Sequence, residues 1–346
     1  MIAARYLRTL IPRPVFGDTA IGIVLVTKNV KGGVWAWVDS YGEPVSRPTN
    51  AWFDAHPVFG GITASIIDGQ HMVCVPKFYF KKLVLPSGTY AGKTAMYLSA
   101  VPFGGSHVHP AFMNVGSEIS QFYYGKYQAS VAVTGKMQSI ASVAPAATLT
   151  IDQFRIAAAA RNNAGVTGFM QHTFWQKSAI QILYLMEYGN GDSQTTLGRG
   201  RVDSTSIAVV SDATVLTASY RGITGLWGNI YQFIDGIKSD PTRNILLWDK
   251  LGNSTWQRYS SNYYAGNAYI DDVNPFVEDG FILYSPSLGG EAVATIPDPQ
   301  YFLAVDGVGI TGSYYDAGNS GGLFNLNLTV APTGAYSAIG SRLAKI

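Results

Sequence analysis

Only two stretches of this chain carry the three-to-four spacing of apolar residues that an amphipathic α-helix requires. The first is TIDQFRIAAAARN, 150–162, which Thr150 or Asp152 can cap. The second is TFWQKSAIQILYLMEYG, 173–189, which stops at a glycine. The chain before them alternates as strands do, and the chain after Gly198 reads as short strands and long glycine-rich loops. This order predicts an α+β protein, with two helices segregated from short antiparallel strands.

A change of pattern near residue 60 divides the chain. A length of 346 residues is a prior for about two domains. Residues 1–60 hold a β-rich run and a turn around Gly42, Glu43 and Pro44, and are predicted to form a small N-terminal region. Residues 61–346 are predicted to form one domain with the two helices, short strands and long ordered loops.

The charge balance excludes some partners. The net charge is +2 and only 13% of the residues are charged, so nothing favours nucleic acid or an anionic membrane surface. The longest early apolar run, AIGIVLV at 20–26, is much too short to span a bilayer, and no membrane insertion is expected.

Patterns that would mark an enzyme are incomplete. GTYAGKT, 88–94, has three residues between its glycines where a phosphate loop needs four. GNSGG, 318–322, resembles the surroundings of a chymotrypsin-like serine but offers no matching base upstream. Cys74, the single cysteine, sits in an apolar strand-like run and is expected to be buried and inert. We therefore assign no catalytic residues.

Two groups of side chains leave metal binding open. His107 and His109 would share one face of a strand, but no third ligand is apparent, so structural histidines are favoured. Asp271 and Asp272 near Asn274, with Glu278 and Asp279, could hold a structural calcium ion through oxygen ligands. A solvated turn is the favoured alternative, so no cofactor and no metal ligand is assigned.

The segment GLWGNIYQFIDG, 225–236, resembles the Gly-x-x-Gly-Asn-x-x-Glu-Trp signature of the formylglycine-generating enzyme family, which has a variant of the C-type lectin fold. The ending AYSAIGSRLAKI, 335–346, resembles the Gly-Phe-Arg-Leu ending of that fold. The resemblance implies a structural motif made of Gly225, Trp227, Gly228, Asn229 and Arg342. Trp227, Tyr231 and Phe233 are expected to supply buried area.

The chain departs from the enzymes of that family at the residues that do their chemistry. Those enzymes use a cysteine pair late in the chain, and their iron-dependent relatives use a histidine triad. Here the only cysteine is Cys74, the histidines are scattered, and the Glu-Trp of the signature is Gln232-Phe233. Since a fold does not carry its function with it, we expect no enzyme.

Four separated stretches resemble bacteriophage tail proteins of the major-tropism-determinant type, in the same order. That resemblance implies a homotrimer at the tail tip or baseplate of a virion, bound to other tail proteins and to a receptor on the bacterial surface. It also implies that residues 1–60 attach to the virion or form trimer contacts. The stretches are 68–80, 109–112, 116–130 and 179–200.

Two tyrosine-rich segments are the candidate receptor-binding loops. In 311–327 the candidates are Tyr314, Tyr315, Asp316 and Asn319, interleaved with glycines. Tyr, Ser, Gly and Asn are the composition of adaptable binding loops, and aromatic rings flanked by Asn and Asp also suit sugar rings. Tyrosines that pack these loops onto the core or a trimer axis are the equal alternative. In 256–272 the candidates are Tyr263, Tyr264, Asn267 and Tyr269.

Three functions remain open. The first is a non-catalytic phage receptor-binding protein that recognises a host glycan or protein, and the second is a baseplate or fibre protein without receptor contact. The third, a glycan-cleaving depolymerase, would need two carboxylates, one with a raised pKa. Its candidates are Asp271, Asp272, Glu278, Asp279 and Asp316.

Overall fold

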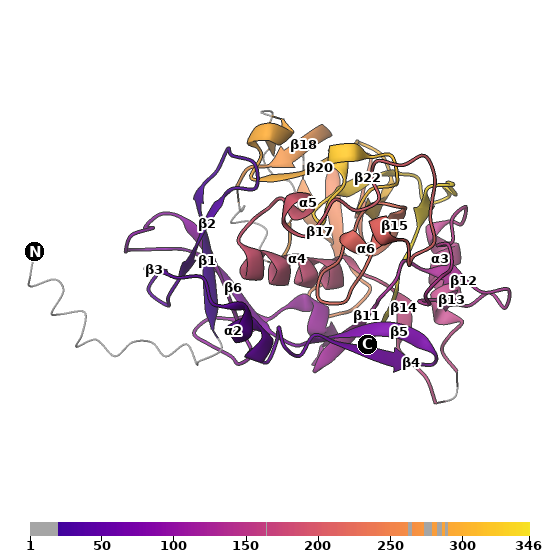
Figure 1. Ribbon diagram of the computed structural model, residues 1–346, viewed down its shortest axis with the longest axis horizontal. Helices are drawn as coiled ribbons and strands as arrows, with labels where there is room; N and C mark the ends of the chain where they lie inside the picture. Colours follow the sequence, from indigo (N-terminus) through magenta and orange to yellow (C-terminus); the bar gives the residue numbers. More distant parts are fainter. Residues whose placement is uncertain (1–19, 164, 262–264, 273–278, 282–285, 288–289) are drawn as a thin grey trace, which may run out of the picture.

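The computed structural model describes residues 20–163, 165–261, 265–272, 279–281, 286–287 and 290–346. Within these ranges β-strands dominate, and they surround one central helix, α4 (Phe174–Tyr188) (Figure 1). The other helical elements are α2 (Asn50–Ala55), α3 (Ile151–Ala159), α5 (Ser193–Thr196), α6 (Ala213–Thr217), η1 (Pro110–Phe112), η2 (Glu291–Val293) and η3 (Gly318–Ser320).

The first sheet joins chain from both sides of residue 60. Its six strands lie in the order β3-β2-β1-β7-β6-β8, and β1 pairs with β7 from Ile21–Leu98 to Val24–Ala95. The predicted boundary at residue 60 stays a prediction, and a division there would cut this sheet. The strands are β1 (Ile21–Thr27), β2 (Val34–Val38), β3 (Pro44–Val45), β6 (Tyr79–Val84), β7 (Thr94–Ser99) and β8 (His107–Val108).

A second sheet of five strands has the order β14-β24-β11-β5-β4, so the C-terminal strand β24 is inserted between β14 and β11. Cys74 lies in it, and burial raises the pKa of its thiol. The strands are β4 (Thr63–Ile67), β5 (Gln70–Pro76), β11 (Gln121–Gly125), β14 (Phe169–Gln171) and β24 (Leu343–Lys345). Two small ribbons pair β9 (Met113–Asn114) with β10 (Ser117–Glu118), and β12 (Ser130–Val131) with β13 (Met137–Gln138).

The third and largest sheet has nine strands and carries the C-terminal half of the chain. Its main order is β17-β16-β15-β21-β22-β20-β18-β19, and β23 pairs with β15. The pairs β20–β22 and β15–β23 are parallel, and the others are antiparallel. The strands are β15 (Tyr231–Ser239), β16 (Asn244–Trp248), β17 (Trp256–Ser261), β18 (Gly266–Ile270), β19 (Pro286–Ser287), β20 (Ile296–Phe302), β21 (Gly307–Thr311), β22 (Leu326–Val330) and β23 (Ile339–Gly340).

Helix α4 lies between these sheets and is buried along almost its whole length. Thr173 and Gln176 form a capping box at its start, and Gly189 ends it in the left-handed conformation. It contacts η1, β1 and β15, so the main hydrophobic core collects residues from all three sheets around it (Figure 1). No helix in the described ranges has the length and apolar character needed to cross a membrane.

The predicted fold class is wrong. The two helical stretches do form α3 and α4, but the described chain is mostly β-sheet, and it does not show a two-helix C-type-lectin-like architecture. The reason lies in the chain after Gly198, which was expected to form short strands and long glycine-rich loops. The backbone groups of this part of the chain pair with one another in nine strands. Seven of these strands have five to nine residues and two have two residues, and hydrophobic periodicity is hard to detect in segments this short.

The segment GLWGNIYQFIDG forms a tightly bonded chain crossing, and Arg342 is its centre. The Arg342 side chain is completely buried, and its Nε donates to Gln232 Oε1 at 2.7 Å. Its two terminal nitrogens donate to the carbonyl oxygens of Gly125, Lys126, Thr224 and Gly225 at 2.6–3.1 Å. Burial lowers its pKa to about 10. A single buried cation therefore donates to four backbone carbonyls from two chain segments, 125–126 and 224–225, and to the Gln232 side chain.

Asn229 and the glycines complete this motif. Asn229 donates to Gln128 Oε1 at 2.8 Å and to Ala208 O at 3.1 Å, and its Oδ1 accepts from Ala208 N at 2.7 Å. Gly228 has φ +72°, and a Cβ there would lie 2.7 Å from Arg201 O. Trp227 is fully buried and donates from Nε1 to Arg199 O at 3.1 Å. The motif therefore fixes the chain that leads to Arg199.

Candidate binding surface

One face of the nine-stranded sheet carries a row of polar and aromatic side chains over β18, β20 and β22, and the same row is buried farther along, at Ile310 and Phe233. Asn267 on β18 pairs with Tyr301 on β20, and Tyr301 pairs with Asn327 on β22. Residues paired across strands point to the same face, so these three side chains form one row. The next row of residues, Ala268, Gln300 and Leu326, is buried on the opposite face. In contrast, Asn267 is exposed and Tyr301 and Asn327 are half-buried.

Tyrosines from four segments extend this row. Tyr231, at the start of β15, stacks on Tyr314 with ring centroids 5.5 Å apart and planes inclined by 23°. Tyr315 meets Tyr314 edge-on at 5.3 Å. Burial raises the pKa of the Tyr231 phenol, and the nearby phenols of Tyr301 and Tyr314 raise it further. Burial likewise raises the pKa of Tyr269, with Tyr301 again a neighbour.

Tyr301 thus lies between the stacked pair of Tyr231 and Tyr314 on one side and Tyr269 on the other. All five tyrosines are half-buried, which gives rings held by packing with edges left open to solvent. Rings held in this way lose little entropy when a ligand binds. We name this set of residues the tyrosine surface: Tyr231, Tyr269, Tyr301, Tyr314, Tyr315, Asn267 and Asn327.

The segment 311–327 is anchored from below rather than free. Gln194, on α5, donates to the carbonyl oxygens of Gly318 and Gly321 at 3.0 and 2.8 Å. Asn325 donates to Pro299 O and to Ser320 O, both at 3.1 Å. The buried Asp298 carboxylate accepts from Phe324 N at 2.8 Å. These bonds satisfy the backbone of the loop and, together with the buried side chains of Leu323 and Phe324, fix the position of Tyr314 and Tyr315.

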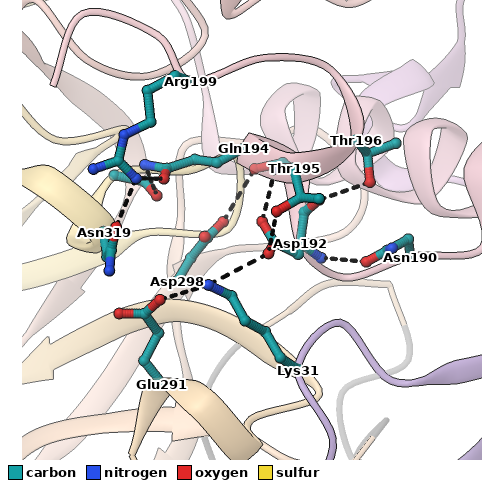
Figure 2. Close-up of polar contacts among 12 residues, drawn as sticks. Lys31, Asn190, Asp192, Gln194, Thr195, Thr196, Arg199, Glu291, Asp298 and Asn319 are labelled. Carbon is teal, nitrogen blue, oxygen red and sulfur yellow. Dashed lines mark hydrogen bonds and ion pairs between the residues drawn. The ribbon is translucent and has the colours of Figure 1, made fainter.

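Arg199 holds the outer rim of this loop. It donates from Nη1 to Asn319 Oδ1 at 2.6 Å, and it forms two bonds with Asp203 at 2.7 and 2.8 Å. Gln194 Oε1 is a further partner of Arg199 (Figure 2). The fork of five N–H donors allows one arginine to bridge the carboxylate and the amide. Asp316 is exposed on the same loop.

A second polar group fixes the support beneath the loop. Asp192 caps α5, accepting from Thr195 N at 3.0 Å and Thr195 Oγ1 at 2.7 Å. Lys31, from the first sheet's β1–β2 turn, bridges Asp192 at 3.6 Å and Glu291 at 2.7 Å (Figure 2). These two ion pairs connect the β1–β2 turn to α5 and η2. Side chains distant in sequence therefore stabilise the position of one loop.

The structure places the predicted binding residues in different settings. Tyr314, Tyr315, Asn267 and Tyr269, predicted on two separate loops, come together on one surface. Asp316 and Asn319 lie on the rim, where Asn319 is bonded to Arg199. Tyr263 and Tyr264 lie outside the described residues. Whether any of them contacts a receptor stays a prediction.

Sequence reasoning missed Tyr301, Asn327 and the stacking of Tyr231 on Tyr314. Tyr231 was expected to supply buried area with Trp227 and Phe233. Those two are completely buried, and Tyr231 is half-buried and packs against the core cluster that contains Phe233. No alternation in the sequence marks Tyr231 as partly open, because β15 is buried from Gln232 to Ile237.

The candidate metal ligands and acids are mostly engaged with each other. His107 and Lys250 both form ion pairs with the buried Asp279 carboxylate, and His109 Nε2 donates to Asp279 O at 3.0 Å. His109 Nδ1 accepts from Ala111 N at 3.2 Å, so its ring is neutral, and burial lowers its pKa to about 4. Although burial opposes it, the bond from His107 helps to lower the pKa of Asp279 to about 2.

The predicted calcium ligands do not gather in the part of the chain that the structure describes. Asp272 pairs with Lys28 at 3.2 Å, and Asp279 is held by His107 and Lys250. No group of three or more His, Cys, Asp or Glu side chains suited to a metal occurs among the described residues. Asn274 and Glu278 lie outside them.

Comparison with known proteins gives only distant likenesses. No protein-family model and no curated protein matches the sequence. Among solved structures, PvdO from Pseudomonas aeruginosa is similar at 12% identity and a TM-score of 0.36, over 82% of this chain and 98% of that chain. The Major Tropism Determinant U1 Variant is similar at 10% identity and a TM-score of 0.33, over 96% of this chain and 82% of that chain. Both are distant structural neighbours, and neither assigns a function to this chain.

Proposed function

We propose that this protein is a non-catalytic receptor-binding protein of a bacteriophage tail, and that the tyrosine surface is its contact with the host cell. The observation that carries the proposal is the row Asn267–Tyr301–Asn327, which joins two separately predicted loops into one rigid surface. The four stretches that resemble phage tail proteins support a location at the tail tip or baseplate of a virion.

The chemistry of this surface suits a bacterial surface glycan or a protein. Half-buried tyrosine rings offer apolar faces and edges to a ligand, and their hydroxyls and the asparagine amides offer hydrogen bonds. The composition matches that of adaptable binding sites, in which rigid aromatic anchors alternate with short polar side chains. A homotrimer would present three copies, so a weak single site would be sufficient through avidity.

A glycan-cleaving activity is less well supported. A glycosidase needs a carboxylic acid whose pKa is raised, close to a second carboxylate. Asp279 has the opposite property, since its pKa is lowered to about 2 and its carboxylate is held by His107 and Lys250. Asp316 is exposed on the loop rim. Asp298, whose carboxyl pKa is raised by burial, is completely buried and accepts from Phe324 N, so it is enclosed beneath the loop. We therefore propose binding without cleavage.

The test measures binding of purified protein to bacteria that the phage infects. The Asn267→Ala/Tyr314→Ala pair changes one residue from each predicted loop, and Tyr336→Ala, an exposed tyrosine outside the surface, is the matched control. Sedimentation and urea unfolding show whether each variant is assembled and folded. Loss of two central contacts is expected to weaken binding by about 30-fold or more.

The outcomes separate the candidate functions. Binding by wild type and Tyr336→Ala, with loss in the folded pair, supports the receptor-binding function. If the assembled wild-type protein binds no susceptible cell, the receptor reading is wrong. The half-buried tyrosines would then be contacts to neighbouring baseplate subunits. Release of sugar from host polysaccharide would contradict the proposal that the protein binds its receptor without cleaving it.

A further inference from the structure

A cleft of about 330 Å³ lies away from the residues of the tyrosine surface and shares none of them. Its wall comes from η1 and β9, from the start of α4, and from the turn between β16 and β17. Clefts that bind small molecules have volumes of roughly 300–1,000 Å³, so this one has room for a single ring-sized group. Met170 and Ile346 complete the wall, so segments distant in sequence converge to form it.

Two tryptophans build the apolar wall of the cleft. Trp175, from the first turn of α4, is buried and donates from Nε1 to Trp248 O at 3.1 Å, which fixes the two segments relative to each other. Trp248 is half-buried at the end of β16. Its indole lies over Gly236 of β15, where a Cβ would be 3.1 Å from the ring. The ring is therefore held against the sheet.

The polar side of the cleft is formed by a turn and by amide and hydroxyl groups. Asp249 accepts from Leu251 N and Asn253 N, both at 3.0 Å, and from Asn253 Nδ2 at 3.0 Å. The Asp249 carboxylate is thus used to hold the turn. Asn114, Asn253 and the exposed Ser254 supply neutral hydrogen-bonding groups beside the tryptophans.

The charge of the cleft narrows the ligand class. None of the described residues that line it is Lys, Arg or His. A phosphate, sulfate or carboxylate ligand would find no cation there, and a purely apolar ligand would leave the amides without partners. A pyranose ring has the matching chemistry, because its C–H face packs on an aromatic ring and its hydroxyls bond to amides.

We propose that this cleft binds one neutral pyranose unit of a saccharide, at a site separate from the tyrosine surface. The cleft would take a sugar whether or not the protein contacts a cell. The inference therefore does not rest on the proposed receptor-binding function, and a solution assay with soluble sugars tests it alone.

The experiment is saturation-transfer NMR of the full chain with a fixed panel of neutral sugars. The panel holds the methyl glycosides of glucose, galactose, mannose, rhamnose and N-acetylglucosamine, with glucuronic acid and glucose 6-phosphate as charged counterparts. At least one neutral sugar is expected to give saturation transfer with a Kd of about 10 mM or tighter, and the charged counterparts to bind more weakly. A wild-type protein that gives no transfer with any neutral sugar, or binds the charged ones as well, overturns the proposal.

Two variants and a control locate the binding. Trp248→Ala removes the aromatic wall, and Ser254→Trp fills the cleft from its exposed rim without touching the core. Both are expected to weaken sugar binding at least tenfold. Tyr336→Ala is the control, because Tyr336 is exposed and does not line the cleft, whereas Trp256 packs its ring against Trp248 and is not suited to this use. Should Ser254→Trp retain full binding, or Tyr336→Ala lose it, the site is not this cleft.

Discussion

Lys177 gives the most direct test of the energetics of the core. It lies in α4, is 3% exposed, and makes one bond, from Nζ to Leu226 O at 3.3 Å. Its pKa is lowered from 10.5 to about 7, chiefly by burial and then by the positive charge of Arg342, while Asp298 partly opposes the change. Burial also raises the pKa of the Asp298 carboxyl well above its usual value. A charged Lys177 is therefore costly to the folded state.

The direction in which stability changes with pH follows from proton linkage. Because the folded pKa is the lower one, the unfolded chain binds more protons between pH 7 and pH 10.5, so stability rises with pH across this window. The full difference of about 3.5 pH units corresponds to about 5 kcal/mol. Replacing Lys177 by Met keeps the length of the side chain and removes the charge. The lost bond to Leu226 O costs about 1 kcal/mol, so a net gain of about 2–4 kcal/mol is expected at pH 7.

Urea unfolding at pH 7 and pH 9 measures both effects. Wild type is expected to gain about 2–3 kcal/mol between these pH values from Lys177, and Lys177→Met to lack this gain. Lys28→Met, at a side chain that is 54% exposed, is the matched control and should change stability by less than about 0.5 kcal/mol. The reasoning is refuted if Lys177→Met destabilises the protein at pH 7, or if wild type and variant respond equally to pH.

Three further predictions concern other buried groups and the loop anchor. His109, with a pKa lowered to about 4, contributes stability that is complete above pH 6.5 and lost as pH falls from 6.5 to 4, by up to about 3 kcal/mol. Chemical unfolding in this window should show a shallower pH dependence for His109→Gln, and an unchanged slope would contradict it. Asn229→Ala removes three buried hydrogen bonds and is expected to cost about 3–5 kcal/mol, whereas a loss below about 1 kcal/mol in urea unfolding would show that the crossing is not held this way. Arg199→Ala should speed amide hydrogen exchange in residues 311–327 with less than about 1 kcal/mol lost globally, because its pairs are exposed; unchanged exchange there would argue against the anchor.

Local signals in the sequence predicted the helices well. The 3.6-residue period, a cap at Thr150 or Asp152 and the stop at Gly189 predicted α3 and α4, since all of these depend on residues close together in the chain. The glycine and asparagine positions of GLWGN also marked a tight crossing. Arg342, more than a hundred residues away, was placed in this motif by resemblance alone, and no local pattern shows that it donates to the carbonyl oxygens of Thr224 and Gly225. Pairings at such distances leave no local pattern.

The same limit explains the wrong fold class and the incomplete site. Strand β20, IPDPQYF, contains Pro297 and Pro299, which argue against a strand inside a sheet, although it pairs on both sides. Tyr301 therefore carried no signal as a binding residue. Asn267 and Tyr314 were predicted from composition alone, and only strand register shows that they share a surface.

The central claim is that the tyrosine surface is one contact site, and Tyr301 tests it most directly because it lies in the middle of that surface and in neither predicted loop. The measurement is adsorption to susceptible bacteria of the purified, assembled protein with Tyr301→Ala, compared with wild type and Tyr336→Ala. We predict that folded Tyr301→Ala loses about tenfold or more in affinity while Tyr336→Ala binds as wild type does. If folded Tyr301→Ala binds cells as tightly as wild type, the tyrosine surface is not the receptor contact.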